Sequence, residues 1–195
     1  MTRRYEIRLS GSGGQGLIIA GIILAEAAGI HDGKYVCQTQ SYDPEARGGA
    51  SKAEVVISDE EIDYPKAIKP DLLLAMNQSS CDTFFFDLKP TGALVVDSTF
   101  VKQLPTSRAV AIPFTQMART ELNKEMAANI IALGALARLT EIVSLGSLEA
   151  AVLNRVPRGT EELNRKALQL GIEAAKRYLA DRSDISRGEE SELGE

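Results

Sequence analysis

An α/β fold of three layers is predicted, with a mainly parallel sheet between helices and a helical C-terminal part. Short apolar runs typical of strands alternate with longer helical segments as far as residue 113. A glycine-rich turn joins the first run to the first helix, and the segments from residue 115 onward have helical character. These three observations together are typical of a Rossmann-like domain.

Six strands are predicted in the first half of the chain. In residues 51–58, SKAEVVIS, polar and apolar side chains alternate, which indicates a strand with one polar face near an edge of the sheet. The continuous apolar run DLLLAM, 71–76, indicates a central strand that is covered on both faces. The other strands are expected at residues 4–10, 34–40, 92–97 and 108–113.

Two of the predicted helical segments are apolar almost all round. Residues 17–30 carry Glu26 as their only charge, and residues 126–137 carry Asn129 as their only polar side chain. Each is therefore either central to the fold or covered by another chain, which favours a subunit of a complex. Helices are expected at 15–29, 78–88, 115–122, 125–143 and 147–155, with a last one after Thr160.

Length and charge define one domain and a tail. We expect residues 1–180 to form a single α/β domain and residues 181–195 to form an acidic, disordered tail. The tail holds six acidic residues and two arginines, which accounts for −4 of the net charge of −5. The domain has no basic stripe for nucleic acid and no apolar stretch long enough for a bilayer, so a cytoplasmic protein is expected.

The inventory of reactive side chains is small. Cys37, Cys81 and His31 are the only thiols and imidazole in the chain. An iron–sulfur cluster or a structural zinc ion normally needs four such ligands, so this chain cannot build either site alone. No Ser-His-Asp relay, phosphate-binding P-loop or pair of carboxylates stands out. We therefore assign no catalytic and no metal-ligating residue to this chain.

A glycine-rich loop is the first candidate site. Three of its glycines fit the G-x-G-x-x-G spacing between a strand and a helix, where backbone N–H groups can face a phosphate. The acid that an NAD site needs at the end of the second strand is missing, since Gln38 and Gln40 stand there. A tight turn for close packing remains the other interpretation. The loop consists of Gly11, Ser12, Gly13, Gly14, Gln15 and Gly16.

A second unusual loop follows the second strand, in SYDPEARGGASK, 41–52. Pro44 restricts the residue before it to extended geometry, and Gly48 with Gly49 permits a sharp reversal into the next strand. Arg47 is either an anchor for a partner chain or anionic group, or a surface arginine in a local ion pair. We assign a partner interface to Pro44, Glu45, Arg47, Gly48, Gly49 and Asn129.

Taken together, the two loops and several later runs make the chain resemble the gamma subunit of 2-oxoacid:ferredoxin oxidoreductases, or the third domain of single-chain pyruvate:ferredoxin oxidoreductases. The similarity covers most of residues 5–180, with Asp43 a departure where relatives commonly have glycine. PEARGG is the most specific run. The runs are GSGGQG (11–16), PEARGG (44–49), NQSSCD (77–82), LKPTGALVVDS (88–98), IPFTQMARTELN (112–123) and AANIIALGAL (127–136).

The resemblance implies a role in a larger enzyme. Such a complex oxidatively decarboxylates a 2-oxoacid on thiamine diphosphate, passes electrons through iron–sulfur clusters to ferredoxin, and transfers the acyl group to coenzyme A. The alpha and beta subunits, with a delta-type subunit in some complexes, carry the cofactors. The gamma subunit is then inactive alone, and its glycine loop forms an interface or a ligand-facing edge.

Two alternatives stay open. An indolepyruvate-type ferredoxin oxidoreductase subunit lies within the same family, although PEARGG fits the 2-oxoglutarate or pyruvate type better. A stand-alone NAD(P)-binding enzyme belongs to a different class and is disfavoured by the missing acid. The substrate contacts are expected on other chains, so these residues do not identify the 2-oxoacid.

Overall fold

The computed structural model describes residues 4–42 and 50–192 of the 195-residue chain, which contain a six-stranded sheet between two helical layers. The strand order is β2-β3-β1-β4-β5-β6. Strand β3 is antiparallel to both neighbours, and β1, β4, β5 and β6 are parallel. The predicted three-layer, mainly parallel fold is confirmed. The strands are β1 Arg4–Ser12, β2 Tyr35–Tyr42, β3 Ala50–Ser58, β4 Leu72–Ala75, β5 Ala93–Asp97 and β6 Val110–Ile112.

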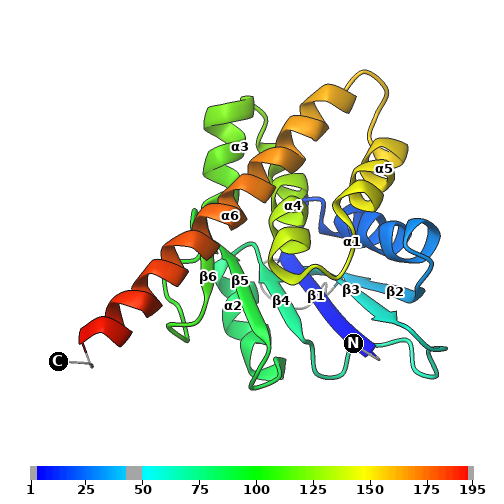
Figure 1. Ribbon diagram of the computed structural model, residues 1–195. Helices are drawn as coiled ribbons and strands as arrows, with labels where there is room; N and C mark the ends of the chain where they lie inside the picture. The colour runs from blue at the N-terminus through cyan, green and yellow to red at the C-terminus, as the bar shows by residue number, and fades with distance from the viewer. Residues whose placement is uncertain (1–3, 43–49, 193–195) are drawn as a thin grey trace.

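The helices divide unequally between the two faces of the sheet (Figure 1). One face carries most of them and shares a single large core with them. The other face carries α2, whose Cys81 packs with Leu73 and Val96 in a smaller core. The helices are α1 Leu17–Glu26, α2 Gln78–Phe84, α3 Phe114–Leu122, α4 Ala128–Thr140, α5 Leu145–Arg155 and α6 Glu161–Glu192.

Short non-α turns extend three of these helices. A π-helical turn, Ala27–His31, follows α1, and 3-10 turns at Phe85–Asp87 and Glu125–Ala127 follow α2 and precede α4. The predicted helix 15–29 therefore starts two residues later and closes in a π turn. Among the described residues, no helix is long and apolar enough to cross a membrane.

The position of β3 corrects one expectation. We predicted residues 51–58 near an edge because their polar side chains alternate, yet β3 lies inside the sheet and β2 is the edge strand. The polar face of β3 is buried because Glu54 pairs with Arg8 of β1 at 2.8 Å, and Arg8 also pairs with Asp87. Buried ion pairs thus produce an alternating pattern in an interior strand.

Helix α4 is the centre of the large core. All ten residues from Ala128 to Ala137 are buried, so for this helix the interpretation as a central element is correct. Its closest neighbour is α6. Gly134 of α4 lies against the Leu168 backbone, and Gly171 of α6 lies against the Ile131 backbone, so that a Cβ atom at either glycine would overlap a carbonyl oxygen.

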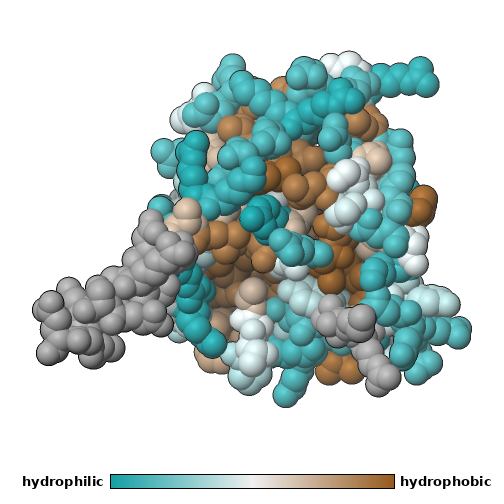
Figure 2. All heavy atoms as spheres, viewed as in Figure 1, coloured by the Kyte–Doolittle hydropathy of each residue, from teal (hydrophilic) through white to brown (hydrophobic). Residues whose placement is uncertain are grey.

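Helix α1 is only partly enclosed by this chain. It packs on β3, α5 and α4, but Ile19 is 38% exposed and Ile30, in the π turn after it, is 73% exposed. Figure 2 shows further apolar side chains in the middle of the α4–α6 face, surrounded by polar ones. The expectation that another chain covers α1 stays a prediction.

The one charge in α1, Glu26, ties it to α5. The buried carboxylate accepts hydrogen bonds from Asn154 (3.1 Å) and from Arg155. Burial acts to raise the pKa of Glu26, but these hydrogen bonds and the positive charges of Arg155 and His31 outweigh it and lower the pKa.

Helix α6 continues across the predicted domain boundary at residue 180. Its backbone is helical as far as Glu192, and in Figure 1 its last turns run out beyond the body of the domain. The boundary therefore does not coincide with a helix end. That residues 181–195 form a separate acidic tail stays a prediction.

Replacing Gly171 by alanine should destabilise the domain strongly. The new methyl group would meet the Ile131 backbone, and overpacking of this kind costs about 1–3 kcal/mol or more. Denaturant melts would measure the loss. Gly146→Ala in α5 is the matched control, because no atom lies within 4 Å of its Cβ position and alanine favours a helix by about 1 kcal/mol. Equal melts for the two variants would contradict close α4–α6 packing.

The Glu26 ion pair should make stability depend on pH. Because the folded-state pKa is lowered, the contribution is present above the ordinary pKa of glutamate and is lost as the pH falls through the folded value. Glu26→Gln should therefore lower the melting temperature at neutral pH and much less in acid. A constant difference across the pH series would contradict this.

Candidate functional site

The glycine loop lies where the chain connectivity changes sides of the sheet. Strand β1 leads into α1 on one face, and its parallel neighbour β4 leads into α2 on the other face. The carboxyl ends of two such strands border a crevice, which is the usual ligand position in open α/β sheets. The predicted loop residues 11–16 occupy this point of the fold.

Hydrogen bonds join the loop to the turn after β4. The backbone N–H of Ser12 donates to Oε1 of Gln15 (2.7 Å), and Nε2 of Gln15 donates to the carbonyl of Met76 (3.3 Å). Nδ2 of Asn77 donates to Oγ of Ser12 (2.7 Å). Asn77 is also the N-cap of α2, where its Oδ1 accepts from the N–H of Ser80 (2.8 Å). The two polar side chains of the loop are thus used to fix its shape.

Gly11 leaves room for the folded-back Gln15 side chain. A Cβ at position 11 would overlap Gln15 Oε1 and would lie 2.8 Å from Leu17 Cδ1 and 3.0 Å from Met76 Cβ. The requirement for glycine here is therefore steric. It explains the first glycine of the motif without any ligand.

Gly14 and Gly16 have left-handed backbones, with φ of 88° and 71°. Gly16 is the N-cap of α1, and its carbonyl accepts a hydrogen bond from Nδ2 of Asn129 (3.1 Å). Asn129 is itself buried, and its Oδ1 accepts from the N–H of Ile130 (2.8 Å). We expected Asn129 at a partner interface, and the structure shows it supporting the loop from inside; the interface role stays a prediction.

The loop offers backbone donors on its outer side. Gly13 and Gly14 are exposed, and the first turn of α1 has no side-chain cap and no acidic residue. A helix N-terminus of this kind favours an anionic group such as a phosphate or carboxylate. The chemistry available here is binding and orientation by amides.

The sheet order argues against a dinucleotide site. In a nucleotide-binding Rossmann fold the second strand lies next to the first, so its terminal acid reaches the ribose. Here β3 lies between β1 and β2, which places the end of β2 two strands away, about 10 Å. Gln38 and Gln40 therefore lie far from the glycine loop. They also lack the negative charge that would bind the ribose of a dinucleotide.

The other loop of the predicted interface, with Pro44, Glu45, Arg47, Gly48 and Gly49, lies outside the described residues. Its flanks are described. Ser12 is opposite Ala50, and Tyr42 is opposite Ser51, so both flanks lie at the sheet edge that carries the glycine loop. Because β3 is antiparallel to both β1 and β2, these two strands run in the same direction, and each loop follows the carboxyl end of its strand.

An apolar groove that the sequence did not reveal adjoins the glycine loop. It encloses about 410 Å³ between the start of α1, the turn before α4 and the start of α6. Asn129 lines it and contacts Gly16, so the groove and the loop are continuous. Ile19 (38% exposed) and Met126 (61% exposed) present apolar surface there, with Lys124 also in the lining.

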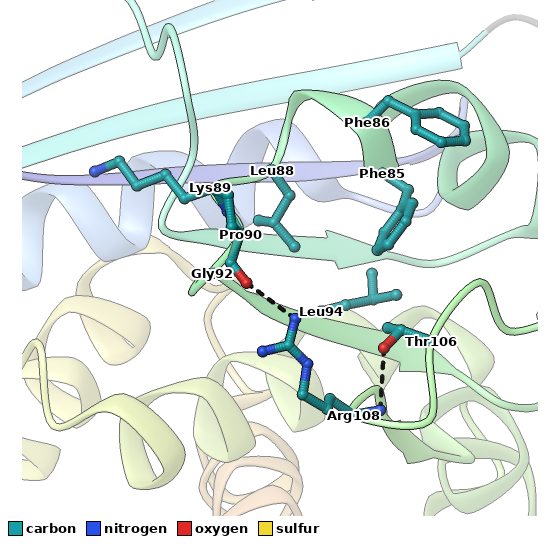
Figure 3. A pocket seen from close by; sticks show the side chains of 9 residues that line it. All are labelled: Phe85, Phe86, Leu88, Lys89, Pro90, Gly92, Leu94, Thr106 and Arg108. Carbon is teal, nitrogen blue, oxygen red and sulfur yellow. Dashed lines mark hydrogen bonds between the residues drawn. The ribbon is translucent and has the colours of Figure 1, made fainter.

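A second recess lies at the opposite edge of the sheet (Figure 3). It encloses about 190 Å³ and is bordered by Gly92, immediately before β5 begins, whereas the glycine loop follows the end of β1. Arg108 donates to the carbonyl of Pro90 (2.9 Å), and Phe86 is 86% exposed. The recess is lined by Phe85, Phe86, Leu88, Lys89, Pro90, Gly92, Leu94, Thr106 and Arg108.

The described residues hold no cluster of three His, Cys, Asp or Glu side chains that could ligate a metal. Burial, with a smaller effect of Asp82, raises the pKa of the Cys81 thiol, which makes it a poor ligand and nucleophile.

Comparison with known proteins gives consistent matches along the chain. The family model described as pyruvate ferredoxin/flavodoxin oxidoreductase matches residues 6–174. The 2-oxoglutarate synthase subunit KorC of Methanocaldococcus jannaschii is 53% identical over 177 residues, which cover 89% of this chain and 95% of that protein.

Two solved structures share the fold. The keto/oxoacid ferredoxin oxidoreductase gamma subunit of Geobacter sulfurreducens has a TM-score of 0.80 and 51% identity, covering 89% of this chain and 99% of that one. The 2-oxoglutarate:ferredoxin oxidoreductase of Magnetococcus marinus, solved with 2-oxoglutarate, coenzyme A and succinyl-CoA bound, has a TM-score of 0.79 and 25% identity, covering 91% of this chain and 32% of that one.

Alanine at Gly16 should disturb the loop more than alanine at Gly14. Both positions carry the left-handed penalty of about 1–2 kcal/mol, but only at Gly16 would the Cβ meet Asn129 Nδ2, at 2.5 Å. Denaturant melts should show a larger loss for Gly16→Ala, and in an Asn129→Ala background the two losses should converge. A persistent difference in that background would contradict the proposed contact.

Proposed function

Because the chain belongs to the pyruvate ferredoxin/flavodoxin oxidoreductase family, as a gamma subunit of 2-oxoacid:ferredoxin oxidoreductases, we propose that it serves an enzyme that oxidises 2-oxoglutarate to succinyl-CoA. The observation that carries the choice of substrate is the 53% identity to a 2-oxoglutarate synthase subunit over nearly its whole length. The similar enzyme from Magnetococcus marinus, which has 2-oxoglutarate bound, supports the same choice.

The proposed division of labour leaves the redox chemistry to other chains. Thiamine diphosphate and the iron–sulfur clusters would lie on the alpha and beta subunits or a delta-type subunit, with ferredoxin as electron acceptor. The cysteines of this chain do not fit a cluster, since Cys81 is buried between α2 and the sheet and Cys37 lies on the edge strand. No step of the reaction is assigned to a side chain of this subunit.

This chain would contribute a binding surface at the carboxyl edge of its sheet, formed by the glycine loop and the adjoining groove. The exposed amides of Gly13 and Gly14 and the uncapped start of α1 fit an anionic group, such as a phosphate of coenzyme A. The adjoining groove, with Ile19 and Met126, would bury its apolar surface against a thiamine-bearing subunit. The edge would thus orient the acyl acceptor and exclude water from the junction.

Reconstitution tests this function. The purified chain alone should neither bind iron nor reduce a dye with 2-oxoglutarate and coenzyme A, and activity should appear when the alpha and beta subunits, and the delta-type subunit of a complex that has one, are added. A substrate panel that includes pyruvate and indolepyruvate identifies the 2-oxoacid. Activity of the single chain would overturn the proposal, and a preference for another 2-oxoacid would overturn the substrate assignment alone.

Arg47→Ala should impair the complex and spare the fold. If Arg47 contacts a partner chain or an anionic group at this edge, its loss weakens assembly or raises the KM for coenzyme A, while the melting temperature of the isolated chain stays unchanged. Arg177→Ala, at an exposed position of α6, is the charge-matched control. If the Arg47→Ala complex assembles and reacts like the wild type, Arg47 is a surface arginine in a local ion pair.

A further inference from the structure

Strand β2 ends the sheet with an open edge. It pairs with β3 on one side, and no other described strand pairs with it. Figure 1 shows it as the last strand at that end of the sheet, with α1 over one face. Backbone N–H and C=O groups along such an edge are available to another strand.

The usual protections of an edge strand are missing from β2. Proteins commonly guard an edge with a charged residue, a proline, a bulge or a very short strand. The sequence YVCQTQSY, 35–42, has no charged residue and no proline. Its eight residues pair with β3 in unbroken register, from Tyr35 opposite Ser58 to Tyr42 opposite Ser51, so no bulge interrupts it.

The five central residues of β2, 37–41, are close to symmetric about Thr39. In an antiparallel pair of two copies centred there, Gln38 of one copy faces Gln40 of the other, and Cys37 faces Ser41. The glutamines match in size and polarity, and Cys37 and Ser41 match in size; beyond them, Val36 would face position 42. Nε2 of Gln38 donates to the carbonyl of its neighbour Thr39 (3.3 Å), and across the axis the Gln38 amide would meet another amide.

The neighbouring charges are compatible with this pairing. On the adjacent strand β3, Glu54 is opposite Thr39. Its carboxylate is already matched by Arg8 (2.8 Å) and Lys52 (3.6 Å). Among the described residues, the axis therefore brings no unmatched charge of one copy against its equivalent in the other.

From these observations we infer that β2 is a homotypic interface, through which two copies of this chain join their sheets by antiparallel pairing about Thr39. The contact is isologous, so it closes as a dimer and does not propagate. It uses the lateral edge of the sheet and leaves the glycine loop free. Neither the family nor the proposed function requires it.

Disulfide trapping tests the pairing and its register. In Ser41→Cys, each new thiol would face Cys37 of the other copy, and mild oxidation should give a covalent dimer that a reductant dissolves. Ser41→Cys with Cys37→Ser should give no such dimer, because residues 41 of the two copies are then far apart. Cys81 is buried and does not compete.

Sedimentation of the full chain over a concentration series tests the interface without cross-linking. The wild type and Thr39→Ser should form a dimer, and Thr39→Lys should shift the distribution to monomer, since two lysines would oppose each other at the axis. Thermal melts confirm that each variant is folded. The inference would be overturned by a monomeric wild type, by a dimer that survives in Thr39→Lys, or by failure of the bridge between positions 37 and 41 to form. If the wild type is monomeric and Thr39→Lys no longer binds the alpha and beta subunits, the β2 edge is an interface with those subunits instead.

Discussion

Two glycines set the distance between α4 and α6, and much of the structure depends on that contact. Gly134 and Gly171 let the backbones of the two helices touch, which allows α6 to cover an α4 that has no polar face. The buried α4 then carries Asn129 at its first turn, where the amide holds the Gly16 carbonyl. The geometry of the candidate site is therefore supported by helix packing in the core.

The glycine loop has the spacing of a nucleotide-binding loop, but its side chains and its place in the sheet do not form a dinucleotide site. Gln15 and Ser12 point into the loop and bind Met76 and Asn77, so their side chains serve the fold. The insertion of β3 between β1 and β2 removes the neighbouring strand end on which a dinucleotide site depends. What remains is a set of exposed amides at a helix N-terminus, suited to holding an anionic group that another subunit also contacts.

Local sequence patterns predicted the strands, the helices and the glycine loop. They did not predict which side chains far apart in the sequence contact each other. The six strands and the helices follow from periodicity and turn residues, and the glycine loop follows from its spacing. The position of β3 inside the sheet could not be predicted in this way, because Glu54 forms its buried ion pair with Arg8, 46 residues away. Asn129 reaches Gly16 across 113 residues. The apolar groove and the recess at the opposite edge of the sheet leave no recognisable pattern in the sequence, since residues from several elements line each of them.

The positions of the polar backbone groups separate two kinds of contact on this subunit. At the carboxyl edge, amides that the helix leaves unpaired point outward along the strand direction, beside an apolar groove. At β2, the unpaired groups point sideways, in the plane of the sheet and across the strands. Because these directions are roughly perpendicular, one copy can present its carboxyl edge to thiamine-bearing subunits while its lateral edge remains accessible. A sheet of this order thus permits an assembly in which each half has its own reaction site and the two halves meet through backbone hydrogen bonds.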